Sequence, residues 1–368
     1  MHKRLAFIDT LRGIAVMAVL VQHVLEVIVQ HHPTGEYYWA FHDAIGYYVN
    51  WGRFGVVLFF FVSGFVIPFS FPDSATPVRD FAISRFFRLY PAYWTSMLVG
   101  LVTMPLLDDK SYSLSQVLVN LTMFQTFVNV PNLWVIYWTL AIELIFYIGC
   151  TVLFAAGLLN QRLTAVYIVV ATSLVCIIGP LVIEKRLVWS LMEVALNLTA
   201  MFMGKMVRDT VIGGKLRWWH VAGCMLLYAV FAVTLSAKRF GGVYQENFFS
   251  TYSIGSAYVL AGLVFVLFAT FGERMAWRPM AFVGVISYSI YLMSPFVLVW
   301  VHHGMSVGDG PLGWSLFVAV VVAASIVTSW ATYSFVEKPC IAFGQRFRSQ
   351  RRRAVVLEPA LTSQGAAE

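Results

Sequence analysis

The chain has 368 residues, of which 60% are hydrophobic and only 12% are charged, and its mean hydropathy is +0.76. Soluble domains carry roughly 25% charged residues, so this composition excludes an ordinary soluble protein and indicates a polytopic membrane protein. The net charge of +7 would suit nucleic acid, but the basic residues lie mainly between apolar runs, as membrane topology requires. We therefore expect no nucleic-acid partner.

Apolar runs long enough to cross a bilayer, about 20 residues each, recur along nearly the whole chain. They predict an all-α bundle of transmembrane helices. We place ten helices at 8–29, 52–72, 89–107, 133–158, 164–183, 188–206, 218–236, 250–271, 281–302 and 312–335. The polar segment 108–131 is expected to form a short interfacial helix. We interpret the first run as an uncleaved span, because Asp9 and Arg12 interrupt it and no small-residue cleavage site follows.

The Lys and Arg residues orient this array by the positive-inside rule. With the N-terminus in the cytoplasm, most of the 25 basic residues fall on the inner side. Those on the outer side are Arg53, Lys110, Lys185, Arg186, Lys238 and Arg239. We therefore predict cytoplasmic N- and C-termini and a multi-pass protein of the inner (plasma) membrane. The membrane domain is expected over 1–340 and a flexible basic tail over 341–368.

The first predicted helix carries polar residues at regular spacing. Arg12 and His23 are 11 residues apart, which is close to three helical turns, so both lie on one stripe. Asp9 and Glu26 extend that stripe by three residues at either end. A polar stripe on a membrane helix must face protein or a water-filled cavity. Arg12 alone could equally serve interhelical hydrogen bonding, whereas His23 is suited to taking and returning a proton.

Two arginines open the third predicted helix. Arg85 and Arg88 are three residues apart and so share one helix face, and Pro91 fits the first turn. On the predicted topology both lie level with Arg12. Three guanidinium groups there would suit a phosphate-bearing ligand, although ordinary positive-inside flanking is the alternative.

Two glutamates lie inside apolar runs, Glu143 in the fourth predicted helix and Glu193 in the sixth. Either could orient a histidine, relay a proton or pair with an arginine, and for Glu193 the structural role is favoured. The outer segment 36–53 is rich in Tyr and Trp, which is typical of an interfacial belt; a sugar-stacking platform is the alternative. The cysteines are isolated, so we expect packing roles and no metal site: Cys150, Cys176, Cys224 and Cys340.

Six motifs occur in a fixed order: "DTLRGIAVMAVLVQH", "FFFVSGFV", "RFFRLYP", "WTLAIELIFY", "SYSIYL" and "VEKP", the last with Glu337. Together, over roughly residues 5–340, they resemble the acyltransferase-3 family of integral-membrane acyltransferases. The resemblance implies transfer of an acyl group, commonly acetyl, from cytoplasmic acyl-CoA to a hydroxyl of a saccharide. It implies that His23 and Arg12 belong to the catalytic site, and it adds Glu143. Where the family often has a histidine, this chain has Ser294, which leaves the acceptor in question.

The resulting hypothesis is a membrane O-acyltransferase with acetyl-CoA, or another acyl-CoA, as donor and no metal. Arg12, Arg85 and Arg88 would bind the donor phosphates, and His23 would remove the acceptor proton. Ser63 is a weaker candidate nucleophile, because small residues in membrane helices usually serve packing. The expected partners are the lipid bilayer and a saccharide or lipid-linked saccharide; a homo-oligomer is left open. A small-molecule or macrolide-type acceptor is an alternative. A proton-coupled transporter or flippase, using the same buried groups as a relay, is the alternative of a different class.

Overall fold

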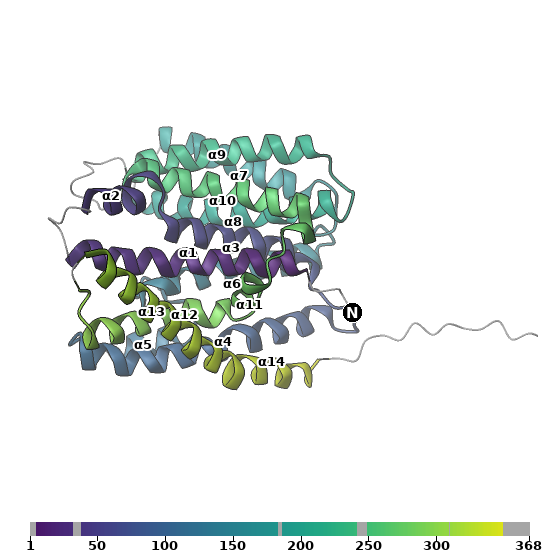
Figure 1. Cartoon of the computed structure of the whole chain (residues 1–368). Coiled ribbons are helices and arrows are strands. Elements are labelled where there is room, and N and C mark those ends of the chain that lie inside the picture. The colour runs from purple at the N-terminus through teal and green to yellow at the C-terminus, as the bar shows by residue number, and fades with distance from the viewer. Residues whose placement is uncertain (1–4, 32–37, 183–185, 241–248, 309, 349–368) are drawn as a thin grey trace, which may run out of the picture.

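The computed structural model describes residues 5–31, 38–182, 186–240, 249–308 and 310–348. Within these ranges the chain is helical and contains no strand, which confirms the predicted all-α bundle. Most of the long helices lie side by side and run roughly along one direction (Figure 1). The helices of ten residues or more are α1 (Ala6–His31), α3 (Trp51–Val66), α4 (Pro77–Leu107), α6 (Trp138–Ala155), α7 (Thr164–Val182), α8 (Arg186–Val211), α9 (Trp218–Phe240), α10 (Thr251–Phe271), α12 (Ser287–Gly304) and α13 (Gly310–Thr332).

Short helices join and cap the long ones. The α-helical pieces are α2 (Tyr38–His42), α5 (Leu114–Asn120), α11 (Arg278–Val285) and α14 (Lys338–Gln345). The 3-10 pieces are η2 (Ile67–Phe69), η3 (Gln125–Val128), η4 (Val135–Tyr137) and η5 (Gly272–Met275), and two π-helices are η1 (Asp43–Tyr48) and η6 (Tyr333–Glu337). The predicted interfacial segment 108–131 contains α5 and η3. The start of α1 and the end of α14 lie at the same end of the bundle (Figure 1).

Length and hydropathy support fewer membrane spans than the ten we predicted. In the described part of the chain six helical stretches are long and apolar enough to cross a membrane, and α11 with α12, bent by 76°, adds a seventh. The six contain α1, α3, α6, α9, α10 and α13. The remaining predicted helices are present, but α7 is a shorter apolar helix, and α4 and α8 carry charged residues within them. The ten-span count and the cytoplasmic termini stay predictions.

Helix α4 begins well before the predicted start of the third helix. Pro77 occupies its first turn and Asp80 follows it, so Pro91 lies in the helix interior and the first-turn prediction was wrong. The helix was predicted to start near residue 89, whereas α4 includes all the charged residues from Arg79 onward. As expected, Arg85 and Arg88 are carried by this helix, which fixes their direction.

Glycines allow several helices to approach to backbone contact, as two positions show. A Cβ atom at Gly284 of α11 would lie 1.7 Å from the carbonyl oxygen of Asp9 in α1. A Cβ atom at Gly64 of α3 would likewise lie 1.7 Å from the carbonyl oxygen of Met201 in α8. Small residues at such crossings are how membrane helices gain packing contacts. Substitution of either glycine would force these helices apart.

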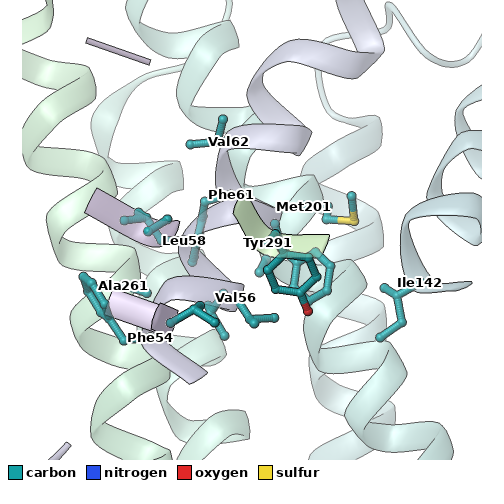
Figure 2. Packing of buried hydrophobic residues seen from close by; sticks show 14 of the residues in the cluster. Phe54, Val56, Leu58, Phe61, Val62, Ile142, Met201, Ala261 and Tyr291 are labelled. Carbon is teal, nitrogen blue, oxygen red and sulfur yellow. The ribbon is translucent and has the colours of Figure 1, made fainter. Parts of the chain in front are cut away.

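Helix α3 is the centre of the hydrophobic core. Figure 2 shows Phe54, Phe61 and neighbouring side chains of α3 packed among residues of other helices, including Met201 of α8 and Ala261 of α10. Phe61 stacks on Phe265 with ring centroids 5.3 Å apart. Because α3 is held on several sides, the residues at its two ends are fixed relative to one another.

Candidate functional site

A cavity of about 630 Å³ lies near the start of α1, between α1, α3, α4, α6, α8, α12 and η6. This volume is within the range of small-molecule sites, about 300–1,000 Å³. Residues of α3 such as Val56 and Phe60 form part of its apolar wall. Its charged lining residues are Asp9, Arg12, Arg85, Arg88, Glu143, Arg208 and Glu337. We call it the arginine cavity.

The three predicted arginines meet in this cavity. Arg12 comes from α1, whereas Arg85 and Arg88 come from one face of α4. Arg12 interacts electrostatically with the charges of Arg88, Glu337, Asp9 and Glu143. In the described part of the chain none of the three arginines has a carboxylate within ion-pair distance. Guanidinium groups in this state retain donors for an anionic ligand.

Both glutamates of the cavity accept hydrogen bonds from hydroxyl groups. Tyr147 donates a hydrogen bond to Oε1 of Glu143 at 2.5 Å, and Ser289 donates to Oε2 of Glu337 at 2.9 Å. The guanidinium of Arg85 lies over the ring of Tyr147, 5.6 Å from its centroid, and its buried Nε has no partner. Tyr147 therefore contacts both Glu143 and Arg85.

A fourth arginine, Arg208 near the end of α8, also lines the cavity. Its Nη1 donates to the carbonyl oxygen of Phe65 at 2.8 Å, and its guanidinium lies 4.2 Å from the ring centroid of Phe69. From the sequence, Arg208 is predicted only as one of the basic residues on the inner side. No spacing or motif distinguishes it, because it reaches the cavity only through the crossing of α3 and α8.

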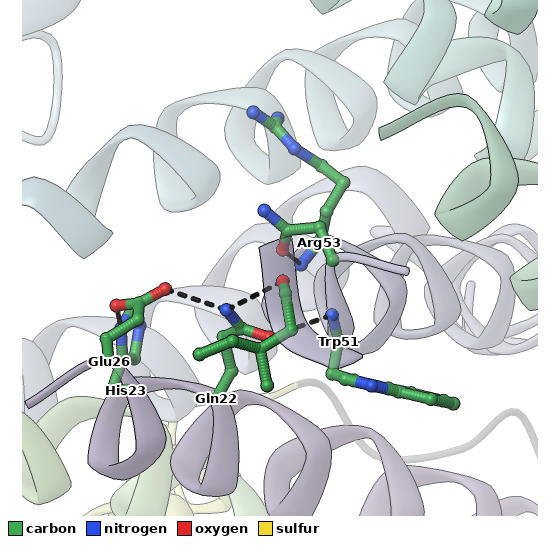
Figure 3. A network of polar contacts seen from close by, with 7 residues as sticks. Gln22, His23, Glu26, Trp51 and Arg53 are labelled. Carbon is green, nitrogen blue, oxygen red and sulfur yellow. Dashed lines mark hydrogen bonds and ion pairs between the residues drawn. The ribbon is translucent and has the colours of Figure 1, made fainter. Parts of the chain in front are cut away.

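His23 is not among the residues that line the cavity. Its Nδ1 lies 3.0 Å from Oε2 of Glu26, and its side chain is 37% exposed. Because a carboxylate only accepts hydrogen bonds, this contact places a proton on Nδ1 and leaves Nε2 as the acceptor of a neutral ring. Gln22 holds the other carboxylate oxygen, donating to Oε1 of Glu26 at 2.9 Å (Figure 3).

Arg12 and His23 therefore do not line the same cavity, and their membership of one catalytic site stays a prediction. Along α1 they are separated by about 16 Å. Helix α3 provides the shorter connection, since the Trp51 amide donates to Oε1 of Gln22 at 3.1 Å, and Val56 lines the cavity. Trp51 and Val56 are five residues apart, which corresponds to a rise of about 7.5 Å along α3. The His23–Glu26 pair thus lies beyond the far end of the cavity.

Glu193 has the structural partner that its position suggested. It pairs with Arg53 of α3, with Oε1 2.6 Å from Nη1, and both side chains are largely buried. The Arg53 guanidinium also lies 5.2 Å from the ring centroid of Trp138 and 6.0 Å from that of Tyr258. This ion pair joins α3 to α8 at the end where His23 lies.

Three remaining predictions can be located. Ser63 lines the arginine cavity, whereas Ser294 is buried within α12 and is not part of the cavity wall. The four cysteines are free thiols. Among the described residues no group of three or more His, Cys, Asp or Glu side chains is placed to hold a metal ion.

Comparison with known proteins gives the following matches. A family model described as an acyltransferase domain matches residues 5–334. The putative peptidoglycan O-acetyltransferase YrhL of Bacillus subtilis (strain 168) is 24% identical over 96% of this chain, and the chain spans 57% of that relative's length. The exopolysaccharide production protein ExoZ of Rhizobium meliloti (strain 1021) is 29% identical over 84% of this chain and 96% of the relative. No solved structure matches the chain.

Proposed function

Because the chain belongs to the acyltransferase-3 family, we propose that it transfers an acyl group, acetyl in the first instance, from acyl-CoA to a hydroxyl of a cell-envelope saccharide. The observation that carries the proposal is the convergence of Arg12, Arg85, Arg88 and Arg208 on one cavity. The printed names of the two relatives, a peptidoglycan O-acetyltransferase and an exopolysaccharide production protein, support a saccharide acceptor.

The arginine cavity would take the phosphate groups of the donor. The planar guanidinium group binds phosphate oxygens through two parallel hydrogen bonds and stays charged at any physiological pH. Arg12 and Arg88 repel each other because both are positively charged. An anion bound between them would offset this repulsion. We propose that the cavity faces the cytoplasm, where acyl-CoA is available, and that the membrane is the plasma membrane.

His23 would act as the general base at the far end of the donor. Its Nε2 would remove the proton of the acceptor hydroxyl as the hydroxyl oxygen attacks the thioester carbonyl carbon. The carbon–sulfur bond then breaks, the ester forms, and the CoA thiolate recovers the proton from the imidazolium. Glu26 would orient the ring and stabilise its charged form, since its Oε2 lies 3.0 Å from Nδ1.

The length of α1 between Arg12 and His23 fits a donor with an extended arm. If the phosphates bind at the arginines, the thioester must lie about 16 Å further along the helix to reach His23. A coenzyme whose reactive group is separated from its phosphates by a long flexible arm meets this requirement. Glu143 stands at the cavity wall near the path of that arm and would keep a polar lining there.

Acetyl transfer can be tested in membranes that contain the native protein. Labelled acetyl-CoA should give label that is bound to envelope glycan and released by mild alkali, and membranes without the protein should give none. Butyryl-CoA in parallel tests the preference for acetyl. If the native protein transports a substrate without consuming the thioester, the acyltransferase proposal is wrong.

A further inference from the structure

The end of the bundle opposite the arginine cavity carries exposed tyrosine rings. Tyr47 and Tyr48 belong to the π-helix η1, and Tyr252 belongs to the first turn of α10. Tyr48 is 63% exposed and Tyr252 is 72% exposed. The ring centroids of Tyr47 and Tyr48 are 5.2 Å apart, and those of Tyr47 and Tyr252 are 6.1 Å apart. We call these three residues the tyrosine platform.

Hydrogen bonds fix the backbone beneath the platform. The Ser250 amide donates to the carbonyl oxygen of Gly46 at 2.9 Å, and the Ser250 hydroxyl donates to that of Tyr47 at 2.7 Å. The Ser256 hydroxyl donates to the carbonyl oxygen of Tyr48 at 2.6 Å. Two segments some 200 residues apart in sequence are thus joined at the backbone that carries the rings. The rings are preorganised, so a ligand that packs on them would not have to order the backbone.

The platform is also connected to the predicted base. Gln22, the residue before His23, donates to the carbonyl oxygen of Ile45 at 3.3 Å, and Ile45 lies in the same π-helix as Tyr47 and Tyr48. Gln22 is only 1% exposed, and Figure 3 shows it between Glu26 and the start of α3. One buried side chain therefore sets the positions of both the His23–Glu26 pair and the helix that carries the tyrosines. Short π-helices of this kind are frequent at functional sites.

We propose that the tyrosine platform binds a sugar ring of the acceptor and presents its hydroxyl to His23. The proposal rests on the acyl transfer proposed above. A pyranose ring has an apolar face of C–H groups that packs against an aromatic ring, and hydroxyl groups at its edge that hydrogen-bond to phenol oxygens. Tyrosine offers both a large rigid surface and a polar tip at low entropic cost. Phosphate would not be retained here, because the three platform residues carry no positive charge.

The competing interpretation is an aromatic belt, since Tyr and Trp gather at membrane interfaces. The belt and the sugar platform predict different effects when a tyrosine side chain is truncated to alanine. Removal of one belt residue leaves the reaction intact, whereas removal of a ring from a sugar platform lowers acceptor use. The experiment compares Tyr48→Ala and Tyr252→Ala with Tyr48→Phe and Tyr252→Phe. Trp219→Ala, at an exposed aromatic residue of α9, is the matched control.

Two measurements are made on each variant at equal membrane levels: alkali-labile acetyl ester on envelope glycan, and CoA binding by the purified protein. We expect each alanine variant to lower ester formation about tenfold, as loss of an anchoring aromatic residue does. The phenylalanine variants should retain most of it, Trp219→Ala should match the native protein, and CoA binding should be unchanged throughout.

Several results would overturn the platform while leaving the proposed function standing. These are native ester levels in both alanine variants, phenylalanine variants as impaired as the alanine ones, or a parallel loss of CoA binding. Failure of the proposed function itself would look different, because the native protein would then form no ester.

Discussion

The two ends of the bundle present opposite chemistry. At the arginine cavity, guanidinium groups from α1, α4 and α8 stand without ion-paired carboxylates in the described chain, while Glu143 and Glu337 accept hydrogen bonds from hydroxyl groups. At the other end two ion pairs lie near each other, His23 with Glu26 and Arg53 with Glu193. Beyond these pairs lie exposed neutral aromatic rings. The first end thus presents guanidinium groups, and the second presents uncharged aromatic rings.

Each end includes one of the two π-helices. The helix η6 contributes Tyr333 and Glu337 to the arginine cavity, and η1 carries Tyr47 and Tyr48. Helices α1 and α3 run between the two ends. In the acyl transfer proposed above, the donor would enter at one end and the acceptor at the other.

The largest expected effect comes from removing the predicted base. His23→Ala should reduce acetyl transfer by about 100- to 10,000-fold, the range associated with general base catalysis. CoA binding should not change, because His23 is outside the arginine cavity. Ester on envelope glycan and CoA binding by the purified protein are measured together. His31→Ala, at an exposed histidine of the same helix, is the control. If His23→Ala formed as much ester as the native protein, His23 would not be the general base.

Breaking the ion pair should destabilise the fold rather than affect one substrate. Glu193→Leu leaves Arg53 without its largely buried partner, which costs about 3 kcal/mol or more. The unfolding midpoint in detergent should fall accordingly, and the double variant Arg53→Met with Glu193→Leu should recover part of the loss. A midpoint equal to that of the native protein, combined with lost transfer, would instead assign this pair to the chemistry.

Neutralising a cavity arginine should weaken donor binding alone. Arg88→Gln removes a charge-assisted contact to phosphate worth about 1.5–3 kcal/mol, which is roughly 10- to 100-fold in affinity for CoA. Arg79→Gln makes the same change at an exposed position of α4, outside the cavity, and should bind CoA normally. Pantetheine, which lacks phosphates, should bind both equally. Equal CoA affinity in the two variants would contradict an anion site.

The smallest effect is expected at the residue that orients the base. Glu26→Gln weakens the contact to Nδ1 of His23 by about 1.5 kcal/mol, which corresponds to about tenfold in the rate constant. The loss should appear in kcat for transfer and leave the Kd for CoA unchanged. An increased Kd for CoA with normal kcat would mean that Glu26 acts on the donor end.

Much of the local structure could be predicted because it depends on nearby residues. Hydropathy identified the apolar helices, and the three-residue spacing of Arg85 and Arg88 placed both on one face. The order of six short motifs indicated the family that the comparison then matched over residues 5–334. Pro91 shows the limit, since it was expected in the first turn of a helix, whereas α4 begins at Pro77 and holds Pro91 in its interior.

The sequence by itself determined an all-helical membrane bundle, the family, and the meeting of Arg12, Arg85 and Arg88. Only the tertiary structure decided that Arg208 joins them and that His23 lies outside their cavity. The reason is physical. Composition and helical period act along one segment, whereas the partners of a side chain depend on which distant helices cross and how closely, here set by contacts such as Gly64 against Met201.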